Sequence, residues 1–296
     1  MKAALIKNRN LQAWILLLTL AIIWGSSFIL IKKGLYVFTP GQLGSLRLSL
    51  AFLFLLPYAV SNIRTVPKDK WKYIILVGVI SIMIPAFLFA IAQTKLTSSL
   101  TGILNALTPL FTLIIGIVIF KFKMKFFQLI GLLLGFIGSI SLSFIDSEGG
   151  FGQMNFFVLF IVVATICYGA GSNIVKARLS DVNSTVLASL SLLVIGPFTV
   201  VYLFSTDFIG RVISTEGSWE ALGYIAILGI VGTGLALALI NRLIQITTPV
   251  FASSVTYLIP IVAVMWGLLD NEKLYLMHYA GMVLIIAGVY IVNKAK

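Results

Sequence analysis

The sequence consists of apolar stretches of roughly twenty residues that follow one another along nearly its whole length. A helix needs about 20 apolar residues to cross the hydrocarbon core of a bilayer, and only helices and closed barrels satisfy their backbone groups there. The pattern therefore predicts an all-α integral membrane protein with ten transmembrane helices. The predicted spans are roughly residues 11–34, 40–60, 72–94, 97–120, 125–145, 154–176, 183–206, 219–241, 248–270 and 274–293.

Composition excludes several other classes of protein. Only 10% of the residues are charged, whereas a soluble domain has about 25%. The net charge of +12 is spread in short clusters between apolar stretches, which argues against a nucleic-acid partner. One cysteine (Cys167) and one histidine (His278) cannot form an internal disulfide or a zinc site. No P-loop, HExxH sequence or pair of intramembrane aspartates is present, so we expect neither an enzyme nor a bound cofactor or metal.

Basic residues predict the orientation of the chain. With the N-terminus inside, fifteen of the 21 lysines and arginines fall in inner segments and five in outer loops, as the positive-inside rule requires. The first apolar run continues to Lys32 and Lys33, so we interpret it as a retained helix and not as a cleaved signal peptide. We expect a multi-pass protein of the cell membrane with both termini cytoplasmic.

The two halves of the sequence repeat each other. Residues 97–120 align with 248–271 at an offset of 151, which pairs Pro109 with Pro260. Trp24 pairs with Tyr168 at an offset of 144. Each half, 11–145 and 154–293, then holds five helices, so the second half enters the membrane from the opposite side. Such inverted repeats are common in secondary transporters, whose binding site lies between the repeats near the bilayer midplane.

Several short segments together resemble the EamA family of the drug/metabolite transporter superfamily, over nearly the whole chain. They are Trp24-Gly25-Ser26-Ser27-Phe28, Arg47, Leu107-Thr108-Pro109, Leu258-Ile259-Pro260 and Glu272 before Gly281 and Gly288. The resemblance implies two EamA repeats and the export or exchange of metabolites such as amino acids. The acidic residue that the family often has after the fourth helix is absent, and Lys121 or Phe122 occupies its place.

Arg47 is the first candidate for substrate binding. It lies inside the second span, where no span offers a mid-membrane carboxylate as a partner. Burying an arginine there costs about 2.5 kcal/mol or more unless it reaches water or a partner. Two interpretations stay open: Arg47 reaches the outer interface or backbone carbonyls, or it faces a central cavity and attracts an anionic or carboxylate-bearing substrate.

Other candidates lie at repeated positions. Pro109 and Pro260 interrupt the backbone hydrogen bonds of their helices, and the freed carbonyls must face protein or a wet cavity. They predict kinks that turn polar groups toward the interior, or kinks that only shape helix packing. Trp24 and Tyr168 lie deep in their spans, where they either form a cavity wall that stacks on the substrate or only pack between helices. Ser27, Asn105, Asn173, Thr256 and Tyr257 complete the predicted binding residues, whereas we expect Gln93 and Asn241 to be solvated near helix ends.

The sequence thus predicts a secondary transporter that exports or exchanges small metabolites, amino acids or related compounds, by alternating access. The alternatives are a drug-efflux member of the same superfamily and a membrane receptor or scaffold that moves nothing. The acids Asp270 and Glu272 lie at the outer end of the ninth span, which favours facilitated export or exchange over proton coupling. The expected partners are a small-molecule substrate and the lipid bilayer, and either a monomer or a homodimer is compatible with the sequence.

Overall fold

The computed structural model describes residues 2–121, 126–144 and 154–294, and within them every regular element is helical. Four helices are continuous and long: α1 (Lys2–Leu35), α2 (Pro40–Asn62), α8 (Val158–Arg178) and α9 (Ser184–Phe204). Thr39 begins α2 with a capping box, in which its hydroxyl accepts from the Gln42 amide and the Gln42 side chain accepts from the Thr39 amide.

The remaining apolar runs are built from shorter helical segments. Their bounds are η1 (Lys68–Lys70), α3 (Trp71–Val77), η2 (Gly78–Met83), α4 (Ile84–Ala92), α5 (Ser98–Asn105), α6 (Thr108–Phe120), α7 (Phe126–Ser143), α10 (Phe208–Ser214), α11 (Ser218–Gly229), η3 (Ile230–Leu235), α12 (Ala236–Ile246), α13 (Pro249–Ser253), η4 (Ser254–Tyr257), α14 (Ile259–Leu269) and α15 (Leu276–Lys294).

Eight runs in the described residues are long and apolar enough to cross a membrane. They are Leu11–Leu35, Pro40–Asn62, Lys68–Ala92, Ser98–Phe120, Val158–Arg178, Ser184–Phe204, Ser218–Ile246 and Pro249–Leu269. Two of the ten predicted spans correspond to shorter apolar stretches, Leu129–Leu142 in α7 and Leu276–Gly288 in α15. The all-helical membrane architecture is therefore confirmed, with eight clear spans.

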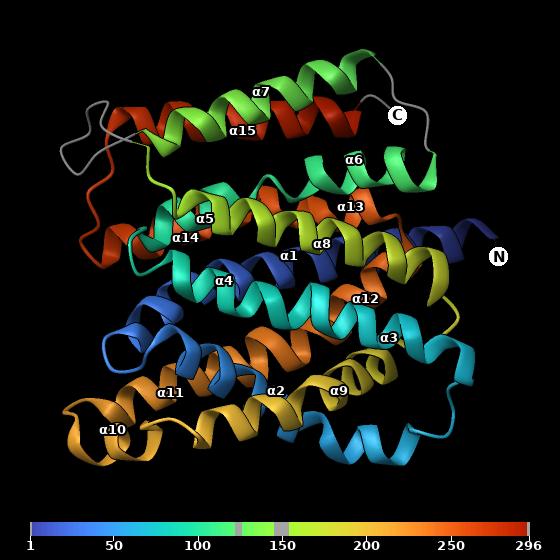
Figure 1. The fold of residues 1–296 in the computed structure, drawn as a ribbon. Helices are drawn as coiled ribbons and strands as arrows, with labels where there is room; N and C mark the ends of the chain where they lie inside the picture. Colours follow the sequence, from blue (N-terminus) through green and yellow to red (C-terminus); the bar gives the residue numbers. More distant parts are fainter. Residues whose placement is uncertain (1, 122–125, 145–153, 295–296) are drawn as a thin grey trace.

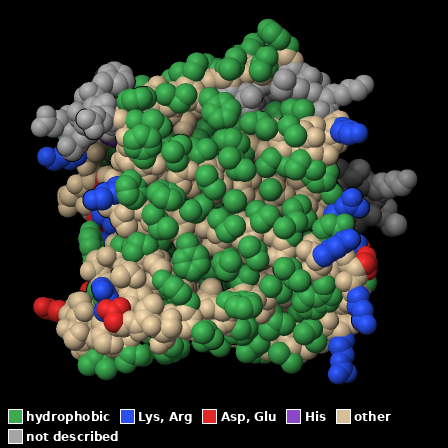
Figure 2. All heavy atoms as spheres, viewed as in Figure 1, with side chains coloured by type: hydrophobic (Ala, Val, Ile, Leu, Met, Phe, Trp, Pro, Cys, Tyr) green, Lys and Arg blue, Asp and Glu red, His purple; other side chains and the backbone are tan. Residues whose placement is uncertain are grey.

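The helices lie alongside one another in one bundle, and α1 begins at the same end of the bundle at which α15 ends (Figure 1). α2 packs on α9 and α7 packs on α15, while α1 contacts α14 and α6 contacts α8. Hydrophobic side chains cover the middle of the face shown in Figure 2, and charged side chains gather at its two ends. Large hydrophobic side chains are widely exposed, among them Phe198 at 72% and Val118 at 73%, as expected of a surface that meets lipid.

Helical irregularities fall where the sequence pattern predicts continuous spans. η2 and η3 are π-helical segments within two of the spans; η2 begins at Gly78, and η3 begins directly after Gly229, which the offset of 151 pairs with Gly78. A π-segment widens the helix by one residue and is frequent at functional sites. Pro109 and Pro260 each lie in the first turn of a new helix, where a missing N–H is harmless. The predicted kinks are thus breaks between two helical segments.

Candidate functional site

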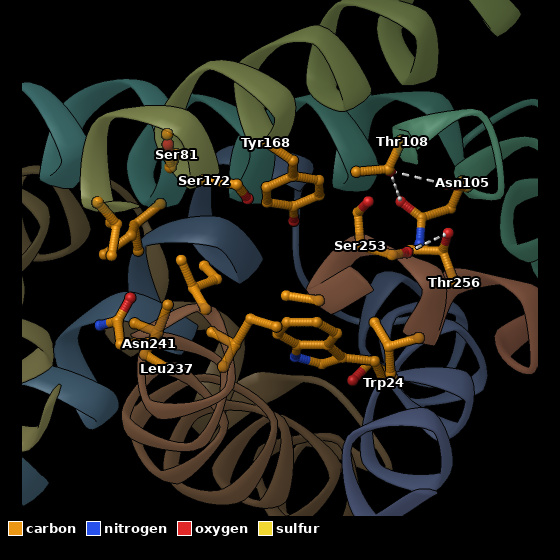
Figure 3. Close-up of a pocket in the computed structure, with 18 of the residues that line it drawn as sticks. Trp24, Ser81, Asn105, Thr108, Tyr168, Ser172, Leu237, Asn241, Ser253 and Thr256 are labelled. Atoms are coloured by element: carbon orange, nitrogen blue, oxygen red, sulfur yellow. Dashed lines mark hydrogen bonds between the residues drawn. The ribbon is translucent and has the colours of Figure 1, made fainter. Parts of the chain in front are cut away.

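A cavity of about 110 Å³ lies inside the bundle, where side chains from both halves of the chain converge. α1, α2, α3, η2, α4, α5 and α6 contribute from the first half, and α8, α12, α13 and η4 from the second. Figure 3 shows the rings of Trp24 and Tyr168 on opposite sides of this space, with the Tyr168 hydroxyl directed into it. The cavity therefore lies where a site formed by two repeats is expected.

Arg47 lines this cavity and is 8% exposed. Its Nε donates to Thr233 Oγ1 at 2.6 Å, and the Thr233 hydroxyl donates in turn to the Leu228 carbonyl at 3.1 Å. Because the Thr233 hydroxyl donates its one proton to Leu228, its oxygen can only accept from Arg47, and this pair of hydrogen bonds orients the guanidinium. Among the described residues, no carboxylate lies within ion-pair distance of Arg47. Arg47 thus faces the cavity, and its attraction of an anionic substrate stays a prediction.

The π-segment η3 positions two cavity residues at once. Its Gly232 carbonyl accepts a hydrogen bond of 3.0 Å from Trp24 Nε1, and its Thr233 hydroxyl accepts from Arg47. The indole N–H therefore has the partner that a buried tryptophan needs. Gly232 has no side chain to obstruct Ser27, whose hydroxyl would lie 3.1 Å from a Cβ at that position. The register of η3 thus determines how Trp24 and Arg47 face the cavity.

The two helix breaks bring polar groups to one side of the cavity, away from Ser81 and Asn241 (Figure 3). Asn105 ends α5 and accepts a hydrogen bond from the Thr108 hydroxyl, and Thr256 lies in η4 and donates to the Ser253 carbonyl at 2.9 Å (Figure 3). Both Asn105 and Thr256 line the cavity. Pro109 and Pro260 are buried behind these breaks and do not line it.

The other predicted residues divide between cavity and packing. Ser27 and Tyr168 line the cavity, and the Tyr168 ring stacks on Phe89 with centroids 5.9 Å apart. Asn173 lies outside the lining, because its amide donates to the carbonyls of Thr112 and Gly169 at 2.9 Å each. Tyr257 also lies outside the lining and packs against the hydrophobic core.

Sequence analysis missed part of the polar lining. Ser81, Ser172 and Ser253 face the cavity, although nothing in their local sequence distinguishes them from other small polar residues in the spans. Thr108, which lies in the segment Leu107-Thr108-Pro109 but was not predicted as a binding residue, also lines the cavity. Asn241 was expected to be solvated, and this was wrong: it is 6% exposed and lines the cavity, because α12 follows the π-segment that turns this face inward.

A cluster of charges closes one end of the bundle, which we call the Lys32 end. Lys32 Nζ lies 2.7 Å from Asp270 Oδ2 and 2.9 Å from Glu272 Oε1, and Lys33 also pairs with Asp270. The backbone amides and hydroxyls of Ser98 and Ser99 all donate to the Glu272 carboxylate, at 2.6–3.0 Å. Glu272 therefore binds the N-terminus of α5, where a negative charge is stabilised.

Two opposing effects act on the Glu272 carboxyl, whose side chain is 2% exposed. Burial alone raises its pKa, but hydrogen bonds from Ser99, Lys32 and Ser98 outweigh burial and leave the pKa below its ordinary value of 4.5. Glu272 is thus a charged, fully bonded group that ties the segment after α14 to α1 and α5.

The other end, which we call the Lys176 end, is held differently. Lys176 occupies the repeat position of Lys32, but its Nζ donates to the backbone carbonyls of Ile244, Gln245 and Thr247 at 3.2, 3.1 and 2.6 Å. These carbonyls terminate α12, and a cation at a helix C-terminus is stabilised by the helix dipole. The positive charge of Lys176 and the dipole of α12 therefore stabilise this end of the bundle.

An apolar layer separates the cavity from the Lys32 end. Phe28, Ile31 and Phe89 are 5%, 1% and 3% exposed, and the two phenylalanine rings lie 5.7 Å apart. Lys32 follows Ile31 directly, so the ion cluster lies just beyond this layer. In the other direction the cavity reaches Val175 and Ile244, in the last turns of α8 and α12. The cavity is therefore sealed toward the Lys32 end and extends toward the Lys176 end.

Comparison with known proteins agrees with this geometry. The model of the EamA-like transporter family matches residues 11–144 and again 155–294. An uncharacterized transporter of Archaeoglobus fulgidus is 24% identical over 97% of this chain and 100% of its own length. The uncharacterized inner membrane transporter YedA of Escherichia coli K12 is 25% identical over 95% of this chain and 90% of its own.

A third relative, a probable amino-acid metabolite efflux pump of Salmonella typhimurium, is 28% identical over 93% of each chain. A solved crystal structure superposes with a TM-score of 0.64 over 96% of each chain at 15% identity, which establishes a shared fold. Because the family model covers nearly the whole sequence in two copies, the chain is a multi-pass membrane protein that belongs to the EamA-like transporter family.

Proposed function

We propose that this protein is a secondary transporter that exports or exchanges small metabolites, amino acids or related compounds, by alternating access. The observation that carries the proposal is a buried, largely apolar cavity with several polar groups, formed by both halves of the chain and sealed toward one end by an apolar layer and an ion cluster. A site near the middle of the membrane with unequal closures is what alternating access requires. Trp24, Ser27, Arg47, Asn105, Tyr168 and Thr256 are proposed to contact the substrate directly, and Pro109, Asn173, Tyr257 and Pro260 to support them.

We also propose ten transmembrane helices in two inverted repeats, residues 11–145 and 154–293. Paired contacts support this: α1 with α14 corresponds to α8 with α6, while α2 with α9 and α7 with α15 each join two equivalent helices. The π-segments η2 and η3 lie at equivalent positions. Lys121 and Asn271, which follow α6 and α14, both have left-handed backbone conformations, with φ of 57° and 59°.

The proposed orientation places both termini in the cytoplasm and the Lys32 end outside. Figure 2 supports it, because lysine and arginine side chains gather at the end where α1 begins. The structure then has its cavity closed to the outside. Transport down a gradient, or exchange, is favoured over proton coupling, because the described lining of the cavity contains neither a carboxylate nor a histidine.

A counterflow assay in liposomes tests the proposal. Purified protein is reconstituted with internal unlabelled metabolites, and the uptake of labelled amino acids and related organic acids is followed with and without a protonophore. We expect uptake that the protonophore does not abolish and that Trp24→Ala reduces about tenfold or more, since this change removes cavity wall. Trp219→Ala is the matched control, because Trp219 is 76% exposed at the surface. A protein that binds compounds but never moves them would be a receptor.

A further inference from the structure

Arg47 presents an uncompensated charge to the cavity. The residue is 8% exposed, only its Nε has a hydrogen-bond partner among the described residues, and the lining of the cavity contains no carboxylate there. The terminal guanidinium nitrogens keep four N–H donors in a planar fork. We propose that the substrate supplies the missing partner, and that this transporter selects small carboxylates over amines. This inference rests on the proposed function, since it names the substrate class of the same cavity.

A planar carboxylate matches the donors that Arg47 offers. A guanidinium binds a carboxylate through two parallel hydrogen bonds, which adds geometric selectivity to charge attraction. Arg47 Nε donates a hydrogen bond of 2.6 Å to Thr233 Oγ1. This bond fixes the plane of the guanidinium and therefore the direction in which its terminal nitrogens donate. Tyr168, whose hydroxyl points into the same space (Figure 3), makes no hydrogen bond to any described residue and offers a further donor.

The surroundings disfavour a cationic substrate. An amine would approach the positive charge of Arg47 and would find no ionic partner among the described residues that line the cavity. The carboxylates of Asp270 and Glu272 are already engaged by Lys32 and Lys33 beyond the apolar layer. Like charges in a medium of low dielectric constant repel strongly, so the cavity should bind an anion more favourably than a cation.

The rest of the lining indicates the body of the substrate. Phe28, Trp24 and Tyr168 supply aromatic surface, and Leu237 and Ile240 supply aliphatic surface. Such walls suit a compact apolar group. The Asn105 side-chain oxygen and the carbonyls at the helix breaks can accept from the ammonium of an amino acid. The shared chemistry is thus a carboxylate on a small apolar body, which both a free amino acid and a simple organic acid provide.

Three compounds with one carbon skeleton separate these chemistries. Leucine has both charges, 4-methylpentanoate has only the carboxylate, and 3-methylbutylamine has only the ammonium. Each is tested by thermal melting of the detergent-purified protein and by counterflow in liposomes. We expect both carboxylates to raise the melting temperature and to drive counterflow, and the amine to do neither. Uptake of leucine but not of 4-methylpentanoate would restrict the class to amino acids, whereas uptake of both would extend it to organic acids.

Variants of Arg47 test the assignment of the residue. Arg47→Gln is expected to weaken both carboxylates about tenfold or more, because a charged hydrogen-bonded partner is lost. Arg64→Gln is the control, since Arg64 is exposed between α2 and η1. Thr233→Val keeps the charge but removes its anchor, so it provides the test if Arg47→Gln does not fold, with an expected loss of several-fold.

The class is overturned if the amine is moved as well as the acids, if none of the three compounds acts on the wild type, or if folded Arg47→Gln protein keeps its affinity for the acids. These outcomes differ from a failure of the proposed function. Transport of the amine alone would leave a transporter of another class, whereas binding of the carboxylates without any counterflow would leave the class intact and remove the transporter.

Discussion

The two ends of the bundle each contain a lysine, Lys32 or Lys176, at equivalent positions of the repeat, but the two lysines bind different groups. At the Lys32 end, Lys32 pairs with Asp270 and Glu272, and Glu272 also holds the N-terminus of α5. At the Lys176 end, Lys176 binds the carbonyls that terminate α12. Removing one partner of a buried ion pair lowers stability strongly, whereas each contact of a charge to a helix terminus contributes less to stability. The Lys32 end is therefore held by charge pairing and the Lys176 end by contacts to a helix terminus, a difference that suits the alternating access proposed for this protein.

The largest effect is expected where the ion cluster that locks the Lys32 end is broken. Glu272→Gln removes the negative charge that Lys32, Ser98 and Ser99 share. It should lower stability by about 3 kcal/mol, because a hydrogen bond to a charged group contributes about 1.5–3 kcal/mol and several are weakened, although Lys32 keeps its pair with Asp270. Thermal melting in detergent measures the loss. Asp181→Asn is the matched control, because the Lys70–Asp181 pair is exposed, with the Asp181 side chain 63% accessible. Equal melting temperatures for the two variants would mean that the ion cluster is no lock.

A smaller effect is expected at the Lys176 end. Lys176→Gln weakens three contacts to the backbone carbonyls that terminate α12, so we expect a loss of about 1–2 kcal/mol. Chemical denaturation of the purified protein, side by side with Glu272→Gln, gives the ranking. If Lys176→Gln proved the more damaging variant, the contrast between the two ends would be reversed.

The smallest effect is expected from pH near neutrality. The pKa values of Asp270 and Glu272 lie below their ordinary values, because hydrogen bonds from their partners outweigh the effect of burial, which acts to raise both. A carboxyl with a lowered folded-state pKa contributes its full stability above its ordinary pKa, which is 4.5 for Glu272, and this stability is lost as the pH falls through the folded-state pKa. Melting temperatures of the wild type and Glu272→Gln should thus keep a constant difference between pH 6 and 8 and converge below about pH 4. Convergence already near pH 6 would contradict this.

The depth of residues in their spans and their place in the repeat predicted the cavity residues Trp24, Arg47, Asn105, Tyr168 and Thr256 as candidates, because polar or aromatic groups inside an apolar span are uncommon. The pairing of Pro109 with Pro260 correctly indicated interrupted helices. The family predicted from these residues was also confirmed.

Other features depend on contacts that no local pattern encodes. The π-segments that orient Trp24 and Arg47 arise in runs that read as ordinary apolar helix. The bond from Glu272 to the N-terminus of α5 joins residues 174 positions apart. The sequence places Asn241 near a helix end, but α12 follows the π-segment η3, and Asn241 lines the cavity. Tertiary register, and not residue type, decided these cases.

The central claim is that the ion cluster closes the cavity at the Lys32 end. Its most direct test places one cysteine in the cavity by Ser27→Cys, in a protein whose own Cys167 is replaced by serine, and applies a membrane-impermeant maleimide from the Lys32 side of the membrane. We predict slow labelling while Glu272 is present and labelling about tenfold or more faster in the Glu272→Gln variant, because a neutral amide binds the α5 terminus less tightly than the carboxylate does. Equal labelling rates in the two proteins, with both folded, would contradict the account.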